Sequence, residues 1–231
     1  MTNRATANDP YVAYLHRFFA KWSPLYDLFA APIGFAYRAA VRAAGAAPGR
    51  LLLDVCTGTG EIARRAARAG ADVVGIDLTP EMLARARAKG AALGVRFELA
   101  DARALPFPTN SFDAALLSFA LHDMPRPVRL RVLAECARVA RGSVVVLDYA
   151  FPDGALARRL AVASLAWYET AYLRGYAREE VEELAAAAGL AARRLRSWLP
   201  LPFALWEVTV GAPAQKASTS PTLAKVPAGL R

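Results

Sequence analysis

Residues 51–63 constrain the fold of this chain more than any other stretch. They read LLLDVCTGTGEIA, an apolar run that reaches an acid and is followed by small residues and two glycines. The apolar run predicts a buried strand, and the glycines allow a sharp turn with the backbone close to a ligand. The helix expected from Glu61 to Ala69 would direct its N-terminal amides at that ligand. The segment therefore predicts the first strand, loop and helix of a ligand-binding α/β sheet.

The alternation of strands and helices continues to about residue 150. Strands are expected at 51–55, 72–76, 95–99, 112–119 and 143–147, with helices between them at 61–69, 79–90 and 127–140. Thr79 as N-cap and Pro80 in the first turn are start signals for the second of these helices. Short apolar strands that alternate with helices are typical of a parallel sheet covered on both faces.

The two ends of the chain follow different patterns. Residues 192–199 and 203–211 flank a proline-containing turn and predict an antiparallel hairpin at the sheet edge, after helices at 155–172 and 178–188. Residues 11–47 are rich in aromatic residues at helical spacing and are interrupted by prolines. This predicts a helical cap whose aromatic residues either form core or line a ligand pocket as a lid.

Together these patterns predict an α/β fold with a Rossmann-like, doubly wound, mostly parallel seven-stranded sheet. An antiparallel C-terminal hairpin and an N-terminal helical lid complete it. We expect a lid over residues 1–47, the ligand-binding domain over 48–211, and a disordered tail over 212–231, which is rich in Ala, Pro, Ser, Thr and Lys.

The net charge of +9 raises the question of a nucleic-acid partner. The basic residues are spread over many predicted helices and form no concentrated stripe, so we expect no nucleic acid. Cys56 and Cys136 make no disulfide framework, and no Cys/His cluster has metal-ligand spacing. With no secretory signal in the first ten residues, the expected location is cytoplasmic. Peripheral membrane contact through the aromatic N-terminal segment stays open.

Polar residues follow the predicted strands at their carboxyl ends, where open α/β sheets bind ligands. They are Asp54, Asp77, Asp101 and Ser118. Asp77 is placed to accept hydrogen bonds from both hydroxyls of a ribose, and Asp101 from an exocyclic amine. Each Asp taken singly is equally typical of a turn or helix cap, but the ordered set indicates a nucleoside-like ligand.

Two cofactor classes fit this arrangement. Gly58, Gly60 and Ala63 satisfy the G-x-G-x-x-A pattern of dinucleotide-binding proteins. Glu61 opposes that interpretation, because a carboxylate at the helix N-terminus would repel a pyrophosphate. S-adenosylmethionine carries a sulfonium and an ammonium group and no phosphate, so the acid-rich strand ends suit it better.

Several segments resemble the class I S-adenosylmethionine-dependent methyltransferases, above all the ubiquinone/menaquinone-biosynthesis C-methyltransferases. The matching segments are LDVCTGTGE at 53–61, GIDLTPEML at 75–83, ADA at 100–102, LPFP at 105–108, SFD at 111–113, SVVVLD at 143–148 and WSPLYD at 22–27. The resemblance covers about residues 15–150 and implies S-adenosylmethionine as the cofactor.

The resemblance also implies a set of cofactor-binding residues. The set is Tyr26, Asp54, Thr57, Gly58, Thr59, Gly60, Asp77, Leu78, Met82, Asp101, Ala102 and Ser118. Asp77 would hold the ribose, Asp101 with Ala102 the adenine, and the 57–60 loop the methionine part. Leu78 and Met82 would flank the adenine ring, and Tyr26 would approach the carboxylate of the cofactor from the lid.

Two positions depart from the family. Cys56 stands where the wider class often has glycine, and His122-Asp123 stands where the quinone enzymes carry Arg-Asn. His122 follows strand four near the expected methyl group, so we predict it as a catalytic general base. The alternative is a loop histidine that positions Asp123 or packs under the lid. Tyr168, Glu169, Tyr172 and Arg174 either line the acceptor side or form the packing and solvent faces of their helix.

The predicted function is methyl transfer from S-adenosylmethionine to a small apolar or amphipathic acceptor. Quinone precursors, phenolic natural products and lipid amines all fit, with the protein acting as a monomer or homodimer. The alternatives are a nicotinamide-dependent oxidoreductase and a non-catalytic S-adenosylmethionine-binding protein. The chain has no obvious Tyr-x-x-x-Lys pair for hydride transfer, which counts against the oxidoreductase.

Overall fold

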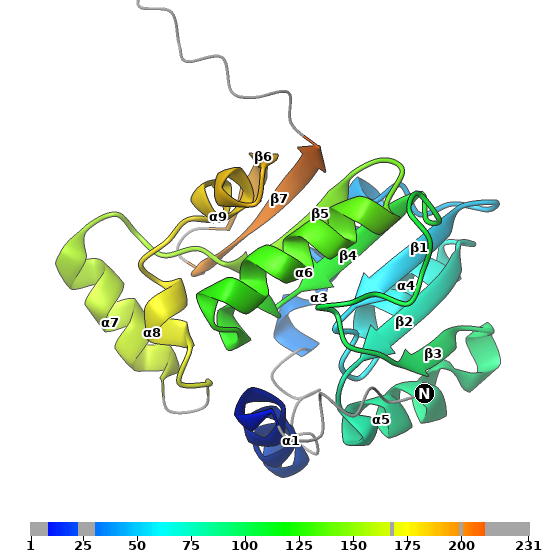
Figure 1. Ribbon diagram of the computed structural model, residues 1–231, viewed down its shortest axis with the longest axis horizontal. Helices are drawn as coiled ribbons and strands as arrows, with labels where there is room; N and C mark the ends of the chain where they lie inside the picture. Colours follow the sequence, from blue (N-terminus) through cyan, green and yellow to red (C-terminus); the bar gives the residue numbers. More distant parts are fainter. Residues whose placement is uncertain (1–8, 23–30, 167–168, 199–200, 211–231) are drawn as a thin grey trace, which may run out of the picture.

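The computed structural model describes residues 9–22, 31–166, 169–198 and 201–210, and its centre is a seven-stranded sheet (Figure 1). The strand order is β3-β2-β1-β4-β5-β7-β6. The strands are β1 Leu51–Val55, β2 Asp72–Asp77, β3 Arg96–Leu99, β4 Ala114–Ser118, β5 Val144–Tyr149, β6 Leu190–Ser197 and β7 Phe203–Val210. The first five pair in parallel, and β7 pairs antiparallel with both β5 and β6. The predicted fold class, including the antiparallel hairpin, is confirmed.

Helices cover both faces of this sheet. One face carries α3 (Gly34–Ala43), α4 (Glu61–Arg68) and α5 (Pro80–Gly90), and the other carries α6 (Arg126–Val139) and α9 (Val181–Ala187). The central strands are apolar throughout because both of their faces are covered, and Leu52, Leu53 and Val55 are fully buried. The parallel strands therefore read as continuous hydrophobic runs.

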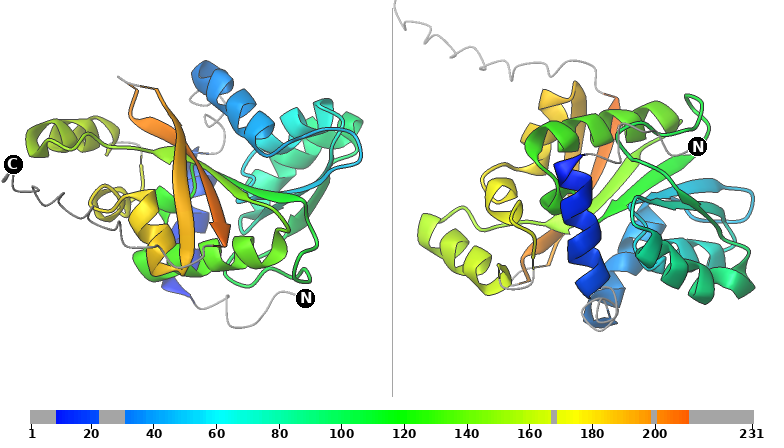
Figure 2. Two further views of the ribbon diagram at one scale, coloured as in Figure 1. Left: turned by 90° about the horizontal axis from the view of Figure 1, so that it is seen from above. Right: turned by 60° about the horizontal axis from the view of Figure 1, so that its bottom comes forward.

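The remaining helices lie around the carboxyl edge of the strands, except for η2 (Ala91–Leu93), which leads into the start of β3. They are α1 (Pro10–Trp22), α7 (Ala155–Leu165) and α8 (Leu173–Tyr176), with the 3-10 turns η1 (Ala31–Ile33), η2 and η3 (Leu121–Asp123). Figure 2 shows α1 crossing in front of the sheet edge. Among the described residues, none of the helices combines the length and apolar character needed to cross a bilayer.

Some predicted boundaries need correction. The helix expected at 155–172 ends at Leu165, and α8 is a separate short helix. The strand expected at 112–119 begins at Ala114, because Phe112 makes only an isolated bridge to Ala140. The expected tail at 212–231 lies outside the described residues, and the predicted domain boundaries stay predictions.

Three glycines make room for a single ring, Phe97 of β3. A Cβ atom at Gly75 would lie 2.7 Å from Phe97 Cδ1, at Gly60 2.9 Å from Cζ and at Gly90 2.6 Å from Cε2. Gly75 is also the register partner of Phe97 across β2 and β3. The ring thus packs β3 against β2, the loop after β1 and the end of α5.

We expect Gly75→Ala to destabilise the fold by about 1–3 kcal/mol, because the new methyl group overlaps a ring held between strands. Denaturant unfolding measures this, and Phe97→Leu in the same chain should restore part of the loss. The matched control is Gly154→Ala, where the nearest atom to the new Cβ is 3.9 Å away. A Gly75→Ala protein as stable as the parent would contradict the packing described.

Candidate active site

The loop after β1 reverses the chain through left-handed backbone conformations. Cys56, Gly58 and Gly60 have φ angles of 56°, 54° and 79°. This conformation explains why the wider class often has glycine at position 56, since it costs a residue with a Cβ some strain. The loop thereby brings its backbone N–H groups to the sheet edge.

Asp54 anchors this loop from below. Its Oδ2 accepts hydrogen bonds from Thr57 Oγ1 at 2.5 Å and from the Ala63 amide at 3.0 Å. Its Oδ1 is buried and accepts none within the described structure. Burial, opposed by these hydrogen bonds, raises the pKa of Asp54 from 3.8 to about 7.

We expect Asp54→Asn to stabilise the protein without added ligand at pH 8 by about 1–3 kcal/mol. The folded pKa lies above the unfolded value, so the folded state binds the extra proton and stability falls as pH rises from about 4 to 7. An uncharged Asn at position 54 removes this dependence of stability on pH. Denaturant unfolding at pH 5 and pH 8 measures the effect, with the exposed Asp153→Asn as control. A variant that loses stability equally at both pH values would contradict it.

Asp77, at the end of β2, joins the same loop to the start of α5. Its Oδ2 accepts from the Gly58 amide at 2.8 Å, and its Oδ1 accepts from the Thr79 amide at 2.9 Å and Thr79 Oγ1 at 2.6 Å. Burial outweighs these bonds and raises its pKa. The carboxylate predicted to hold a ribose therefore also shapes the loop beside it.

Asp101 is held by a guanidinium group that the sequence did not reveal as part of the site. Arg103 donates to Asp101 Oδ2 from Nε at 2.9 Å and from Nη2 at 2.7 Å, and Nη1 donates to Asp9 at 2.5 Å. Asp9 immediately precedes α1. Within α1, Tyr14 Oη accepts a hydrogen bond from the Ala171 amide at 3.0 Å. These contacts tie α1 across the carboxyl ends of the strands.

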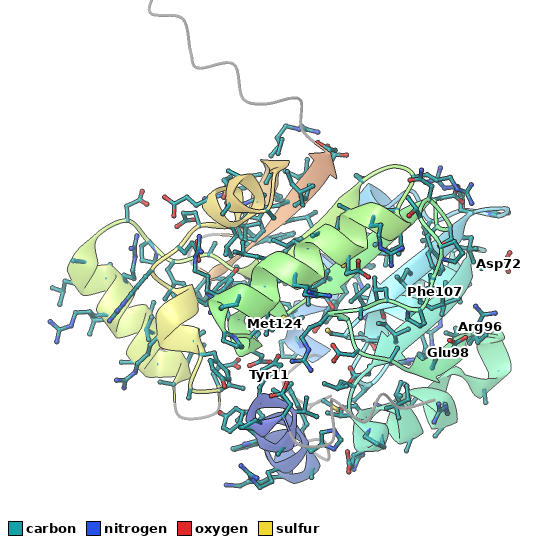
Figure 3. The ribbon with its side chains drawn as sticks, in the orientation of Figure 1. Tyr11, Asp72, Arg96, Glu98, Phe107 and Met124 are labelled. Carbon is teal, nitrogen blue, oxygen red and sulfur yellow. The ribbon has the colours of Figure 1, made fainter. Side chains whose placement is uncertain are left out.

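The strand-end cavity lies between these carboxylates and α1. Tyr11 and Met124 line it from α1 and from the end of η3 (Figure 3). Of the predicted cofactor-binding residues it contains Gly58, Asp77, Leu78, Met82, Asp101 and Ala102. Asp54, Thr57, Thr59, Gly60 and Ser118 do not line it, and Tyr26 lies outside the described residues. Lining residues that the sequence did not predict include Cys56, Arg103, Leu15, Phe19, Phe119, Val128 and Val132.

A second cavity, the aromatic cavity, adjoins the first. Its lining residues are Phe18, Phe19, Trp22, Ile33, Tyr37, Phe119, His122, Asp123, Tyr149, Leu165, Glu169, Pro202 and Phe203. Phe19, Phe119 and Asp123 line both cavities. The two cavities therefore share these three residues along a common border.

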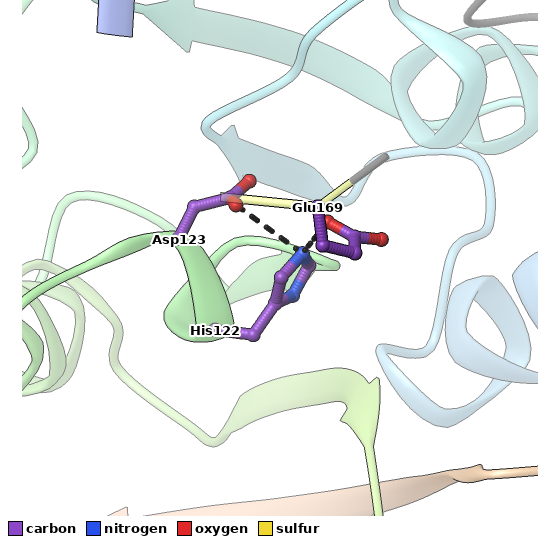
Figure 4. A group of neighbouring side chains, drawn as sticks. All are labelled: His122, Asp123 and Glu169. Carbon is purple, nitrogen blue, oxygen red and sulfur yellow. Dashed lines mark hydrogen bonds and ion pairs between the residues drawn. The ribbon is translucent and has the colours of Figure 1, made fainter. Parts of the chain in front are cut away.

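His122, Asp123 and Glu169 meet at the base of the aromatic cavity (Figure 4). His122 Nε2 lies 3.1 Å from Glu169 Oε2 and 3.5 Å from Asp123 Oδ1. On the other side of the ring, Nδ1 lies 2.7 Å from Asp148 Oδ1. Because carboxylates flank both nitrogens, the ring donates from both and carries a positive charge.

The charges in this group decide its protonation. Burial lowers the pKa of His122, but Asp123, Asp148 and Glu169 outweigh it and raise that pKa well above its usual value. Burial also raises the pKa of Asp123 to about 7, against the opposing charge of His122. Two groups with raised pKa values, His122 and Asp123, therefore lie side by side at the aromatic cavity.

The carboxylates are themselves held in place. Asp148 accepts from the amides of Ala120, Leu121 and Tyr149 in addition to His122. Tyr149 Oη donates to Glu169 Oε1 at 2.6 Å. Among the sequence candidates on the 168–174 stretch, Glu169 reaches the aromatic cavity, and Tyr168 lies outside the described residues.

Glu61 has local partners that weaken one sequence argument. It pairs with Arg64 and with Arg65, whose Nε lies 2.7 Å from Glu61 Oε1. Two guanidinium groups offset the carboxylate at the start of α4. Its charge is therefore a weaker argument against a pyrophosphate than the sequence indicates.

Comparison with known proteins shows what the central part of this chain resembles. Residues 52–143 match the family model described as a methyltransferase domain. Over 146 residues the chain is 40% identical to a demethylmenaquinone methyltransferase of Thermus thermophilus, covering 58% of this chain and 65% of that protein. Over residues 52–143 the chain is therefore similar to methyltransferase domains.

Two further comparisons extend beyond the methyltransferase domain. An uncharacterized protein of Mycobacterium tuberculosis is 34% identical over 167 residues, which cover 65% of this chain and 60% of that protein. The magnesium protoporphyrin IX methyltransferase of Synechocystis, solved with bound SAH, matches with a TM-score of 0.61 at 16% identity. It covers 86% of this chain and 98% of that chain, and at this identity it supports the fold alone. The chain spans about 60–65% of the length of the two curated relatives.

The methyltransferase domain and the flanking segments contribute differently to the two cavities. The strand-end cavity is built from the domain, apart from Tyr11, Leu15 and Phe19 of α1. Most of the aromatic cavity comes from residues before 52 or after 143, including Glu169 and Tyr149. The domain match therefore describes one half of the site far better than the other.

Proposed function

We propose that the protein transfers a methyl group from S-adenosylmethionine in the strand-end cavity to a small apolar or amphipathic acceptor in the aromatic cavity. The observation that carries this proposal is that the two cavities meet at Phe19, Phe119 and Asp123. Methyl transfer is an in-line displacement, and holding two ligands in contact and aligned supplies much of its acceleration. Quinone precursors, phenols and amines all belong to the acceptor class that such a cavity fits.

The residues around the strand-end cavity suit the donor. Asp77 would bind the ribose hydroxyls, while Leu78 and Met82 would lie against the adenine. Asp101 would accept from the adenine amine while keeping its pair with Arg103. The buried Oδ1 of Asp54, which accepts no hydrogen bond in the described structure, is an acceptor beneath the loop proposed to hold the methionine part. When bound, the donor supplies an electrophilic methyl group on a positively charged sulfur.

His122 is the proposed general base for an acceptor that must lose a proton. Asp148 holds the Nδ1–H at 2.7 Å and so directs Nε2 toward the aromatic cavity. The anionic neighbours make the neutral ring a strong proton acceptor once its own proton has left. Aromatic rings line the cavity around it.

Calorimetric titration tests the donor half of this proposal. S-adenosylmethionine and its demethylated product should bind, and NAD should not. Tight NAD binding without S-adenosylmethionine binding would overturn the proposal in favour of an oxidoreductase. A mass-spectrometric screen of quinols, phenols and amines tests the acceptor half, because donor binding without any methylated product would indicate a non-catalytic binding protein.

A further inference from the structure

The aromatic cavity combines apolar walls with an acidic base. Seven of its lining residues are aromatic: Phe18, Phe19, Trp22, Tyr37, Phe119, Tyr149 and Phe203. The titratable groups Asp123, Glu169 and His122 lie together at the base, with their ligating atoms within 4.8 Å of one another. Such a cavity pairs a hydrophobic binding surface with a local excess of negative charge.

No lysine or arginine is present among the described residues that line this cavity. The three internal segments outside the described residues, 23–30, 167–168 and 199–200, contain neither residue in their sequence. Arg129 is buried nearby, but its guanidinium donates to Leu121 O at 3.0 Å and lies over the Tyr176 ring at 5.0 Å. An anionic acceptor would therefore meet two carboxylates, with no lysine or arginine among the described lining residues to pair with.

The carboxylates differ in how far they are neutralised. Asp148 has four donors and is fully satisfied. Glu169 accepts one hydrogen bond from the imidazole of His122 and one from the hydroxyl of Tyr149. Asp123 is 8% exposed, and its Oδ1 accepts no hydrogen bond, with His122 Nε2 at 3.5 Å as its nearest ion-pair partner. One imidazolium thus faces three carboxylates, Asp123, Asp148 and Glu169, and a second cation would be stabilised there.

We propose that the acceptor is a hydrophobic amine, which binds as an ammonium ion between Glu169 and Asp123 with its apolar part among the aromatic rings. Ring faces attract organic cations, and the attraction increases when the cation is removed from water. A neutral phenol or quinol would fill the apolar volume but would leave the carboxylates without an added counter-charge. This inference rests on the proposed methyl transfer for its chemistry, although not for the binding itself.

The same group supplies a route for the proton. An ammonium ion beside Glu169 competes with the imidazolium for that carboxylate and repels its charge, so the ring releases its Nε2 proton to solvent. The neutral ring then accepts one proton from the ammonium, which frees the nitrogen lone pair. The nitrogen forms a bond to the methyl carbon while the carbon–sulfur bond breaks, with its electron pair remaining on sulfur. The positive charge passes from sulfur to the methylated nitrogen, and the proton stays on His122 until it exchanges with solvent.

Binding of two probes of equal shape tests the cation site without any turnover. Benzyltrimethylammonium carries the charge, and neopentylbenzene is its neutral counterpart; calorimetry and tryptophan fluorescence follow both. We expect the cation to bind at least about tenfold more tightly. Glu169→Gln keeps an acceptor for Tyr149 and should remove most of this preference while leaving the neutral probe unchanged. Glu207→Gln, a half-buried carboxylate paired with Arg193 at 2.8 Å, is the matched control.

Three results would overturn the inference. The first is equal binding of the two probes, and the second is a Glu169→Gln variant that keeps the full preference for the cation. The third is micromolar binding of Mn²⁺, seen by electron paramagnetic resonance and lost in Glu169→Gln, which would identify a metal site instead.

Titration of the same preparations with S-adenosylmethionine separates failure of this inference from failure of the proposed function. Cation binding without donor binding would overturn methyl transfer and leave the cation site standing. Donor binding with no preference for the cation would overturn the amine acceptor alone. With both ligands bound, mass spectrometry should show N-methylated products from primary or secondary amines, and methylation confined to phenols or ring carbons would contradict the inference.

Discussion

Replacing His122 with alanine is expected to lower turnover by about 10²- to 10⁴-fold, the usual contribution of a general base. The affinity for S-adenosylmethionine should change little, because His122 lines only the aromatic cavity. Single-turnover assays with saturating donor measure the chemical step, and calorimetry measures donor binding.

Two controls keep this result interpretable. His122→Asn retains an N–H group that can donate to Asp148 but places no base at the position of Nε2, so it should fold normally and remain slow. His16→Ala, in α1, replaces the other histidine of the chain and should retain turnover. Parental turnover in both His122 variants would rule out the general-base role.

Asp77→Asn is expected to weaken S-adenosylmethionine binding by about 10- to 100-fold, the effect of losing hydrogen bonds to a charged group. The carboxylate would accept from the ribose, and it already holds the amides of Gly58 and Thr79. An Asn side chain has one acceptor atom instead of two, so it cannot satisfy both amides in the same geometry. Calorimetric titration measures the loss.

The matched control for this change is at the other end of the same strand. Asp72 begins β2, is exposed, and lies far from Tyr11 and the cavity (Figure 3). Asp72→Asn should leave donor affinity unchanged, and thermal unfolding should show whether either variant alters the fold. Equal donor affinity in Asp77→Asn and the parent would remove Asp77 from the binding set.

The fold could be predicted from the sequence because its signals are local. The apolar run at 51–55 becomes β1 with those same bounds, and Asp54, Asp77 and Ser118 fall within the last two residues of their strands. Burial on both faces produces unbroken hydrophobic runs, and glycine-rich loops mark where they end. Two boundaries shifted: the helix expected at 155–172 ends early, at Leu165, and the strand expected at 112–119 begins late, at Ala114, because Phe112 makes only an isolated bridge.

The acceptor side could not be derived in the same way, because it is assembled by contacts between distant segments. Glu169 lies 47 residues from the histidine that it contacts, and Arg103 pairs with Asp9 across 94 residues. No periodicity or motif reports such pairs. The left-handed backbone at Cys56 had one indirect signal, the glycine that the wider class often carries there, because a cysteine itself does not indicate a positive φ.

The position of α1 has a thermodynamic consequence. This helix forms a wall of both cavities, through Tyr11 and Leu15 on one side and Phe18 and Trp22 on the other, with Phe19 between them. A displacement of α1 that opens one cavity opens the other, and a ligand that holds the helix in place stabilises both. The free energies of binding of the two ligands are therefore linked through α1, and linkage of this kind acts equally in both directions.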